Sequence, residues 1–282
     1  MKRILFLTIC VSYLSLIDAQ DFEVGGALGT SLYSGDLAPA EFGVYFETLN
    51  PSAGMFLRMN VGRAFAGRLG LNYARVSGDD ELGPHPDRGL SFRSDIIELA
   101  LTGELDLFRI GYPDVVQVEP YLFGGVAAYR FNPQTQFEGQ WVSLQPLGTE
   151  GQGLEGYEEP YNLIQLAIPM GGGIKIHFNT VWTLGFEFGG RFLSTDYLDD
   201  VSDVDVNYNE LLAGNGPLAA QLSNPSIENA GGEEVVYRRG SEFDDWYYIG
   251  SVTLSYHFGN VGGGYGRLPR QRRGRTLGCP TF

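Results

Sequence analysis

The 282-residue sequence has 34 acidic and 19 basic residues, giving a formal net charge of −15, and it is rich in glycine, tyrosine and phenylalanine. Beyond its first 19 residues, no segment approaches the roughly 18 continuous apolar residues that a membrane helix needs, which excludes a helical membrane protein. The composition instead suits short alternating strands, in either a membrane barrel or a soluble β-sandwich.

The N-terminal segment 1–19 has the features of a secretory signal peptide. Two basic residues precede a long apolar run, and a small residue stands before the expected cleavage site at Gln20. Cys10 lies inside this segment, so we expect the mature chain to keep one cysteine, Cys279.

Eight later segments alternate apolar and polar residues with a period of two, which predicts half-buried strands. In the last one, Val252, Leu254 and Tyr256 alternate with Thr253 and Ser255. The eight predicted strands are 22–32, 55–65, 68–75, 97–107, 121–131, 163–178, 181–192 and 246–258.

Two local irregularities are expected within this pattern. A tight turn at Ala66 and Gly67 is predicted between the second and third strands. Pro169 cannot donate a hydrogen bond to a neighbouring strand, so a bulge or irregularity is expected there.

The lengths of the connections alternate, which favours a barrel over a sandwich. Connections after the second and sixth strands are short, and the one after the fourth (109–119) is moderate. Outer-membrane barrels have short periplasmic turns and long external loops. The long connections are 33–54, 76–96, 132–162 and 193–245. We therefore predict an all-β fold in which residues 20–258 form an eight-stranded antiparallel transmembrane β-barrel, with both termini in the periplasm and acidic extracellular loops.

One face of strand 97–107 carries three carboxylates, Glu98, Glu104 and Asp106, which could not face lipid. They predict a charged, filled lumen, so we expect no general diffusion pore. Other charged residues expected on lumen faces are Arg58, Arg68, Arg75, Lys175, Glu187 and Arg191.

The sequence gives little sign of catalysis. His85 is expected in an external loop and His177 and His257 in strands, where they are interpreted as polar lumen residues. No cysteine or histidine metal motif, GxSxG motif or Walker-type loop occurs, so neither an enzyme nor a cofactor is predicted. An outer-membrane enzyme would need an Asp/His or Ser/His cluster among the loops.

The stretch 196–205 is the densest in acidic residues. Asp203, Asp205 and Asn207 have the spacing of the first ligands of a calcium loop, but Tyr208 occupies the position that needs glycine. They are a weak calcium candidate, and a solvated acidic loop is the simpler expectation.

The tail 259–282 has five arginines and no acidic residue, and it is expected to be disordered unless bound. In the periplasm it would contact an acidic protein surface, peptidoglycan or anionic lipid headgroups, not nucleic acid. Cys279 suggests an intermolecular disulfide, and a free thiol is the alternative. The arginines are Arg267, Arg270, Arg272, Arg273 and Arg275.

Several stretches resemble the PorG-like (DUF6089-type) family, whose members are porin-like outer-membrane barrels of the type IX protein secretion system of Bacteroidetes. The most specific are TDYLDDVS, with Asp196, Tyr197, Asp199 and Asp200, and TEGQG. The matching stretches are 33–37, 149–153, 168–173, 195–202, Arg239-Gly240 and Cys279-Pro280.

This resemblance implies a non-catalytic subunit that anchors or organises a periplasmic ring, built of a lipoprotein and its partner subunit. Cys279 is a candidate for a disulfide to that ring. The alternatives are a paralogue outside secretion, a small outer-membrane channel, or an adhesin that binds through its acidic loops.

Overall fold

The computed structural model describes most of the chain between the expected signal peptide and the expected basic tail. Segments 1–19 and 259–282, including Cys279 and the five tail arginines, lie outside the described residues. Those residues are 21–39, 45, 48–111, 116–227, 234–241 and 244–258.

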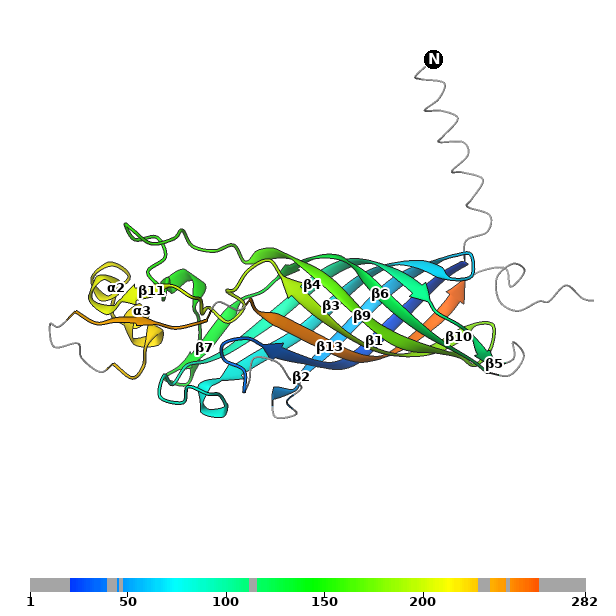
Figure 1. Cartoon of the computed structure of the whole chain (residues 1–282), viewed down its shortest axis with the longest axis horizontal. Helices are drawn as coiled ribbons and strands as arrows, with labels where there is room; N and C mark the ends of the chain where they lie inside the picture. Colours follow the sequence, from blue (N-terminus) through cyan, green and yellow to red (C-terminus); the bar gives the residue numbers. More distant parts are fainter. Residues whose placement is uncertain are drawn as a thin grey trace, which may run out of the picture.

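The protein forms a closed, eight-stranded antiparallel β-barrel, which confirms the predicted fold class (Figure 1). Each strand pairs with its neighbour in the chain, and the last pairs with the first. The barrel strands are β1 (Asp21–Ser34), β2 (Asn50–Val61), β3 (Phe65–Asp79), β4 (Ser91–Asp106), β6 (Gln117–Arg130), β9 (Ile164–His177), β10 (Trp182–Leu193) and β13 (Trp246–Phe258).

The barrel closes along the seam between β1 and β13. Phe22 pairs with Phe258 at one end of this seam, and Ser34 pairs with Trp246 at the other. The described chain therefore starts and finishes at the end of the barrel that carries the short turns.

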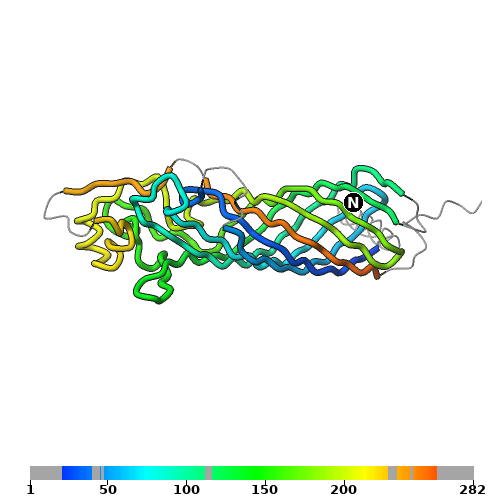
Figure 2. Tube along the Cα trace, turned by 90° about the horizontal axis from the view of Figure 1, so that it is seen from below, coloured from blue at the N-terminus to red at the C-terminus, as the bar shows by residue number. Residues whose placement is uncertain are grey.

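The opposite end carries the long connections, which extend well beyond the barrel wall (Figures 1 and 2). Within the described residues, no helix is long and apolar enough to cross a membrane. The smaller elements are β5 (Ile110–Gly111) at the turn end, and η3 (Asp80–Leu82), β7 (Pro133–Phe137), β8 (Gln140–Ser143), η4 (Gln145–Leu147), β11 (Asp205–Asn207), α2 (Tyr208–Gly214), α3 (Pro217–Ser223) and β12 (Val236–Arg238) at the loop end.

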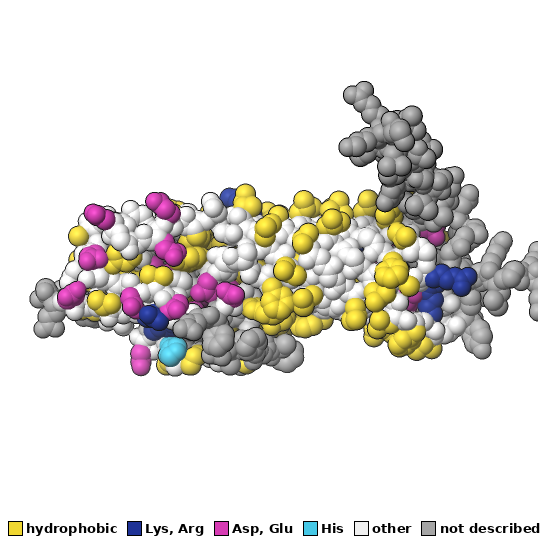
Figure 3. Space-filling model, turned by 45° about the horizontal axis from the view of Figure 1, so that its top comes forward, with side chains coloured by type: hydrophobic (Ala, Val, Ile, Leu, Met, Phe, Trp, Pro, Cys, Tyr) yellow, Lys and Arg dark blue, Asp and Glu magenta, His cyan; other side chains and the backbone are white. Residues whose placement is uncertain are grey.

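The strands alternate between an apolar outer face and a polar or small inner face. In β4, Leu99 and Leu101 are 53% and 59% exposed, whereas Glu98 and Glu104 are 1% and 2% exposed. Exposed apolar side chains cover the middle of the barrel, and acidic side chains gather at the loop end (Figure 3).

The predicted turn between the second and third strands was misplaced. Ala66 and Gly67 belong to β3, where they pair with Asn60 and Met59. The turn lies at 62–64, where Gly62 has a φ of +71°, a conformation that glycine adopts without the strain a Cβ would add.

The prediction that Arg75 faces the lumen is wrong. Arg68 points inward, and β3 keeps an uninterrupted register with β4, so residue 75 must point outward with Tyr73. There Arg75 pairs with Asp95 of β4, with Nε 2.7 Å from Oδ1.

Near Pro169, the ladder between β6 and β9 is interrupted, as expected. The pairs opposite Pro169 and Ile168 are missing, but the register is the same on both sides of the gap. The irregularity is therefore a break in the ladder, without a bulge.

Candidate functional site: the charged lumen and the loop cap

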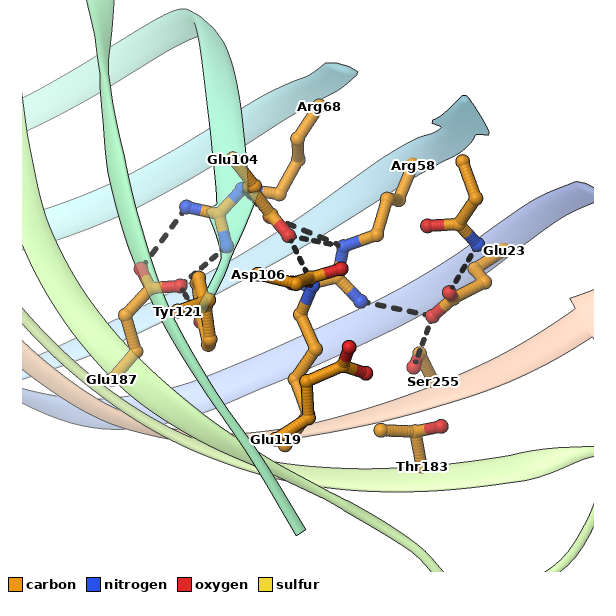
Figure 4. A network of polar contacts seen from close by, with 12 residues as sticks. Glu23, Arg58, Arg68, Glu104, Asp106, Glu119, Tyr121, Thr183, Glu187 and Ser255 are labelled. Carbon is orange, nitrogen blue, oxygen red and sulfur yellow. Dashed lines mark hydrogen bonds and ion pairs between the residues drawn. The ribbon is translucent and has the colours of Figure 1, made fainter. Parts of the chain in front are cut away.

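Glu104 is the centre of an ion-pair network inside the barrel (Figure 4). One of its carboxylate oxygens lies 2.9 Å from Arg58 Nε and 2.7 Å from Lys175 Nζ. Arg68 Nε lies 3.4 Å from the other oxygen. Lys175 also contacts Asp106 at 2.7 Å. Three strands therefore supply cations to the acidic face of β4.

Further acids extend this network across the lumen. Glu23 of β1 binds Arg58 Nη1 at 2.9 Å and accepts a hydrogen bond from Ser255 of β13. Arg68 forms a close ion pair with Glu187 of β10. The Tyr121 hydroxyl donates to Glu187 at 2.6 Å. Ion pairs thus connect opposite walls of the barrel.

A second group lies nearer the loop end. Glu98 is 3.2 Å from Arg191 Nε and accepts hydrogen bonds from Tyr247 and Asn72 at 2.6 and 2.7 Å. The structure therefore places eight of the nine charged residues predicted on lumen faces inside the barrel, in two clusters, and Arg75 is the exception.

The lumen between these clusters is nearly full. A cavity of about 30 Å³ remains, lined in part by Arg68, Phe123, Glu187 and Arg191. A water molecule needs roughly 10–15 Å³ of such volume, so the cavity has room for about two waters.

Near the turn end, a carboxylate, an imidazole and a hydroxyl stand in series. Glu119 lies 3.0 Å from His177 Nε2, and His177 Nδ1 lies 2.8 Å from Thr183 Oγ1. The order resembles a hydrolytic triad. However, Thr183 is only 2% exposed, and its hydroxyl is also 3.1 Å from His257 Nε2. Shared polar packing explains this arrangement better than catalysis.

Sequence reasoning missed Glu23 and Glu119 as members of the lumen. Glu23 alternates with Phe22 and Val24, so the period-two pattern already contained its signal. Glu119 was assigned to a connection, but it lies in β6 and points inward.

The long connections form a compact assembly, here called the loop cap, from segments 33–39, 79–90, 144–161, 194–227, 234–241 and 244–245. Four of the stretches that carry the family resemblance meet in it. Arg239 Nη1 lies 2.7 Å from Thr149 Oγ1, 3.6 Å from Glu150 Oε1 and 3.5 Å from Asp200 Oδ2. TEGQG, TDYLDDVS and Arg239-Gly240 therefore share one buried ion cluster.

The expectation that the acidic stretch is solvated is wrong for its centre. Asp199 and Asp200 are 1% and 0% exposed. Tyr161 donates to Asp200 Oδ1 at 2.6 Å, and Glu150 accepts from the Ser202 amide at 2.8 Å. Burial raises the pKa of Glu150 to about 7.

Asp199 also approaches Asp245, which lies just before β13. Tyr33 Oη, from the end of β1, is 2.6 Å from Asp199 Oδ2 and 2.7 Å from Asp245 Oδ1. The amides of Val201 and Leu198 donate to the remaining oxygens. Burial raises the pKa of both carboxyl groups well above the ordinary value.

The other two residues of the family motif lie at the side of this pair. Burial and the nearby Asp36 raise the pKa of Asp196 to about 8. Tyr197 stacks on Tyr161 with ring centroids 4.5 Å apart. The motif therefore packs the cap together, and burial raises the pKa of its three carboxyl groups, Asp196, Asp199 and Asp200.

The weak calcium candidate is not assembled. Asp203 and Asp205 both pair with Arg238, and Asn207 Oδ1 accepts from the first amides of α2. Within the described ranges, no group of three His, Cys, Asp or Glu side chains is arranged to hold a metal ion.

The DUF6089 family (domain of unknown function) matches residues 2–219, which is most of the chain. The protein belongs to the DUF6089 family. No curated protein matches it.

Several solved structures are similar to this DUF6089 protein. Neisserial surface protein A shares 10% identity over 85% of this chain and 97% of its own, with a TM-score of 0.40. A major outer membrane protein from Thermus thermophilus shares 14% identity over 85% and 100%, with a TM-score of 0.41. The attachment invasion locus protein Ail of Yersinia pestis shares 9% identity over 85% and 97%, with a TM-score of 0.36.

Proposed function

We propose that this protein is a non-enzymatic outer-membrane barrel that anchors or organises the periplasmic ring of a type IX protein secretion machine. The observation that carries the proposal is the contrast between the two faces of the barrel wall. An apolar outer face surrounds a lumen closed by ion pairs. This arrangement favours a membrane anchor over a channel.

The dimensions of the apolar face support a membrane location. From Ile97 to Leu107, ten residue steps of about 3.4 Å rise about 25 Å along the axis when a strand tilts by about 40°. This rise matches the apolar band of about 25 Å in outer-membrane barrels.

The proposed orientation follows from the ends of the barrel. If the long loops face outward, as in known outer-membrane barrels, then Asp21 and Phe258 lie on the periplasmic side. The tail 259–282 would then extend toward a periplasmic ring. Its arginines and Cys279 are the proposed contacts with the ring lipoprotein and its partner subunit.

The link to type IX secretion rests on the family resemblance, and a deletion tests it directly. Loss of the gene is expected to block export of folded cargo, and the wild-type gene to restore it. Normal export in the deletion strain would reject the secretion role and favour an adhesin or a paralogue.

The proposed contact with the ring has its own test. Non-reducing electrophoresis of outer membranes should show a dithiothreitol-sensitive adduct with a periplasmic protein, absent in Cys279→Ser. If no adduct forms, co-purification of ring components is compared between the wild type and a variant with glutamine at all five tail arginines. Loss of co-purification in the variant would indicate a contact that depends on charge, and absence of ring components from both samples would indicate no contact.

The alternative of a small channel is tested in planar bilayers. Because ion pairs around Glu104 cross the lumen and the cavity beside Arg68 and Glu187 holds only about 30 Å³, the wild-type protein is expected to show no conductance steps. Reproducible steps that are absent from empty bilayers would favour the channel.

A further inference from the structure

Three arginines face outward at the loop-side edge of the apolar band. They are Arg75 of β3, Arg93 of β4 and Arg130 of β6, and we call them the rim arginines. The strand register places all three around Asp95. Arg75 lies directly opposite Asp95, Arg93 is two residues along the same strand, and Arg130 pairs with the neighbouring Ile97.

Among the described residues, the rim arginines are the basic side chains that face outward at the loop-side edge of the apolar band. The other basic side chains of the described part lie in the lumen, in the loop cap, or at the turn end, where Arg63 and Arg109 are found. On the wall formed by β10 and β13, the same rim carries Phe192, Trp246 and Tyr248. The positive charge is thus confined to one wall.

Only part of this charge is neutralised. Asp95 holds Arg75 and accepts a hydrogen bond from Tyr73 at 2.7 Å. Arg93 lies over the ring of Trp141, 3.7 Å from its centroid. Arg130 is exposed and has no ion pair within the described part of the chain. Three arginines around one aspartate leave a net positive patch on a strongly acidic protein.

The patch lies where lipid chains would give way to headgroups. Directly below it, toward the turn end, the outward side chains are Leu71, Ile97 and Ala128. Tyr73 and Trp141 flank it, and these residue types are enriched at membrane interfaces. Guanidinium groups bind phosphate through paired, charge-assisted hydrogen bonds.

We propose that the rim arginines bind the phosphate group of a phosphorylated glycolipid in the outer leaflet. Asp95 would hold Arg75 in place, and the exposed Arg130 would complete the site. This inference rests on the membrane location and orientation given under the proposed function, but not on the role in secretion.

Native mass spectrometry of the folded protein in detergent tests the site, with phosphorylated lipid A as the probe and its dephosphorylated form as the matched lipid. The triple variant Arg75→Gln/Arg93→Gln/Arg130→Gln is expected to bind phosphorylated lipid A about tenfold more weakly than wild type. Arg63→Gln removes an exposed arginine at the turn end and is expected to bind like wild type.

Two results would overturn the site: equal binding of phosphorylated lipid A by wild type and triple variant, or equal binding of the two lipids by wild type. If the triple variant fails to fold, Arg130→Gln alone replaces it, because Arg130 is exposed and makes no ion pair with the described residues. Its binding is expected to weaken about threefold, and unchanged binding would also overturn the site.

A separate measurement distinguishes failure of the site from failure of the membrane location. Wild-type protein should fold into phosphatidylcholine vesicles, seen as a heat-dependent change in electrophoretic mobility. A protein that never folds into vesicles would overturn both inferences, whereas a folded triple variant with unchanged lipid A binding would overturn the lipid site alone.

Discussion

Asp199 and Asp245 lie near the two ends of the long connection between β10 and β13, and they share one partner, the hydroxyl of Tyr33, at 2.6 and 2.7 Å. A hydroxyl has one hydrogen and can donate it to only one carboxylate. The second short contact therefore requires a proton on the other carboxyl group. Burial and the neighbouring acids Asp36 and Asp196 raise the pKa of both groups in the same direction.

The proton held by the Asp199–Asp245 pair makes the stability of the loop cap depend on pH. Because the folded cap binds more protons than the unfolded chain, its stability should fall as pH rises above the ordinary aspartate pKa of about 3.9. The loss should continue through the raised values, including those of Glu150 at about 7 and Asp196 at about 8.

Hydrogen exchange between pH 5 and 9, corrected for the intrinsic exchange rate, measures this effect. The amides of Leu198 and Val201, which donate to the two carboxylates, should lose protection as pH rises, while amides of β4 should not. Asp245→Asn should reduce the pH dependence, because an amide side chain does not ionise. Constant protection of Leu198 and Val201 over the whole range would contradict the presence of a proton on Asp199 or Asp245.

The two adjacent arginines of the cap should differ sharply in their contribution to stability. Arg239 is 3% exposed and compensates Glu150 and Asp200, so Arg239→Gln leaves buried carboxylates without a cation. Removing one partner of a buried ion pair costs about 3–5 kcal/mol. Limited proteolysis should therefore cleave the 196–205 segment of this variant much faster.

Arg238→Gln is the matched control, because its exposed pairs with Asp203 and Asp205 are each worth about 1 kcal/mol or less. Equal cleavage rates for the two variants would show that the Arg239 cluster does not hold the cap closed.

Inside the barrel, Glu104→Gln should be strongly destabilising. The neutral amide leaves Arg58, Arg68 and Lys175 with one anion fewer in a closed lumen, at a cost of about 3–5 kcal/mol in the free energy of unfolding. Urea unfolding from lipid vesicles measures it. Asp205→Asn makes the same chemical change on a side chain that is 64% exposed and should cost less than about 1 kcal/mol.

Two neighbouring glycines of the wall should tolerate alanine very differently. A Cβ at Gly125 would lie 2.1 Å from the Leu101 carbonyl oxygen, whereas a Cβ at Gly103 would meet nothing closer than 3.9 Å. Gly125→Ala should lower the free energy of unfolding by about 1–3 kcal/mol. Gly103→Ala should change it by about 0.5 kcal/mol or less. A similar loss in both variants would mean that the strand spacing relaxes around the new methyl group.

The barrel and its lumen could be predicted because they depend on a local rule. Every second side chain faces inward, so Glu98, Glu104 and Arg191 were assigned from their own strands alone. Arg75 was assigned against that rule, seven residues after the inward-facing Arg68, and the structure places it outside. The turn between β2 and β3 begins at Gly62, four residues before the predicted position. Its place depends on the positive φ of Gly62, which many other glycines in this sequence could also adopt, so the sequence alone does not locate it.

The loop cap could not be predicted in the same way, because its contacts join distant parts of the chain. Tyr33 meets Asp199 across 166 residues, and Thr149 meets Arg239 across 90. No local pattern distinguishes such buried acids from solvated ones, and solvated ones are much commoner. The signal in the sequence was the set of separate family stretches, four of which meet in space.

The seam between β1 and β13 also constrains how this protein can be made. The strand that seals the wall is the last described segment of the chain, Trp246–Phe258, and it pairs with the first. A nascent chain must therefore stay unsealed, with two open lateral edges exposed to other strands, until synthesis has passed Phe258. Truncation within these 13 residues would leave β1 and β10 with unpaired edges, so the barrel could not close. Loss of the final strand should therefore lead to degradation or aggregation of the protein and not to a smaller barrel.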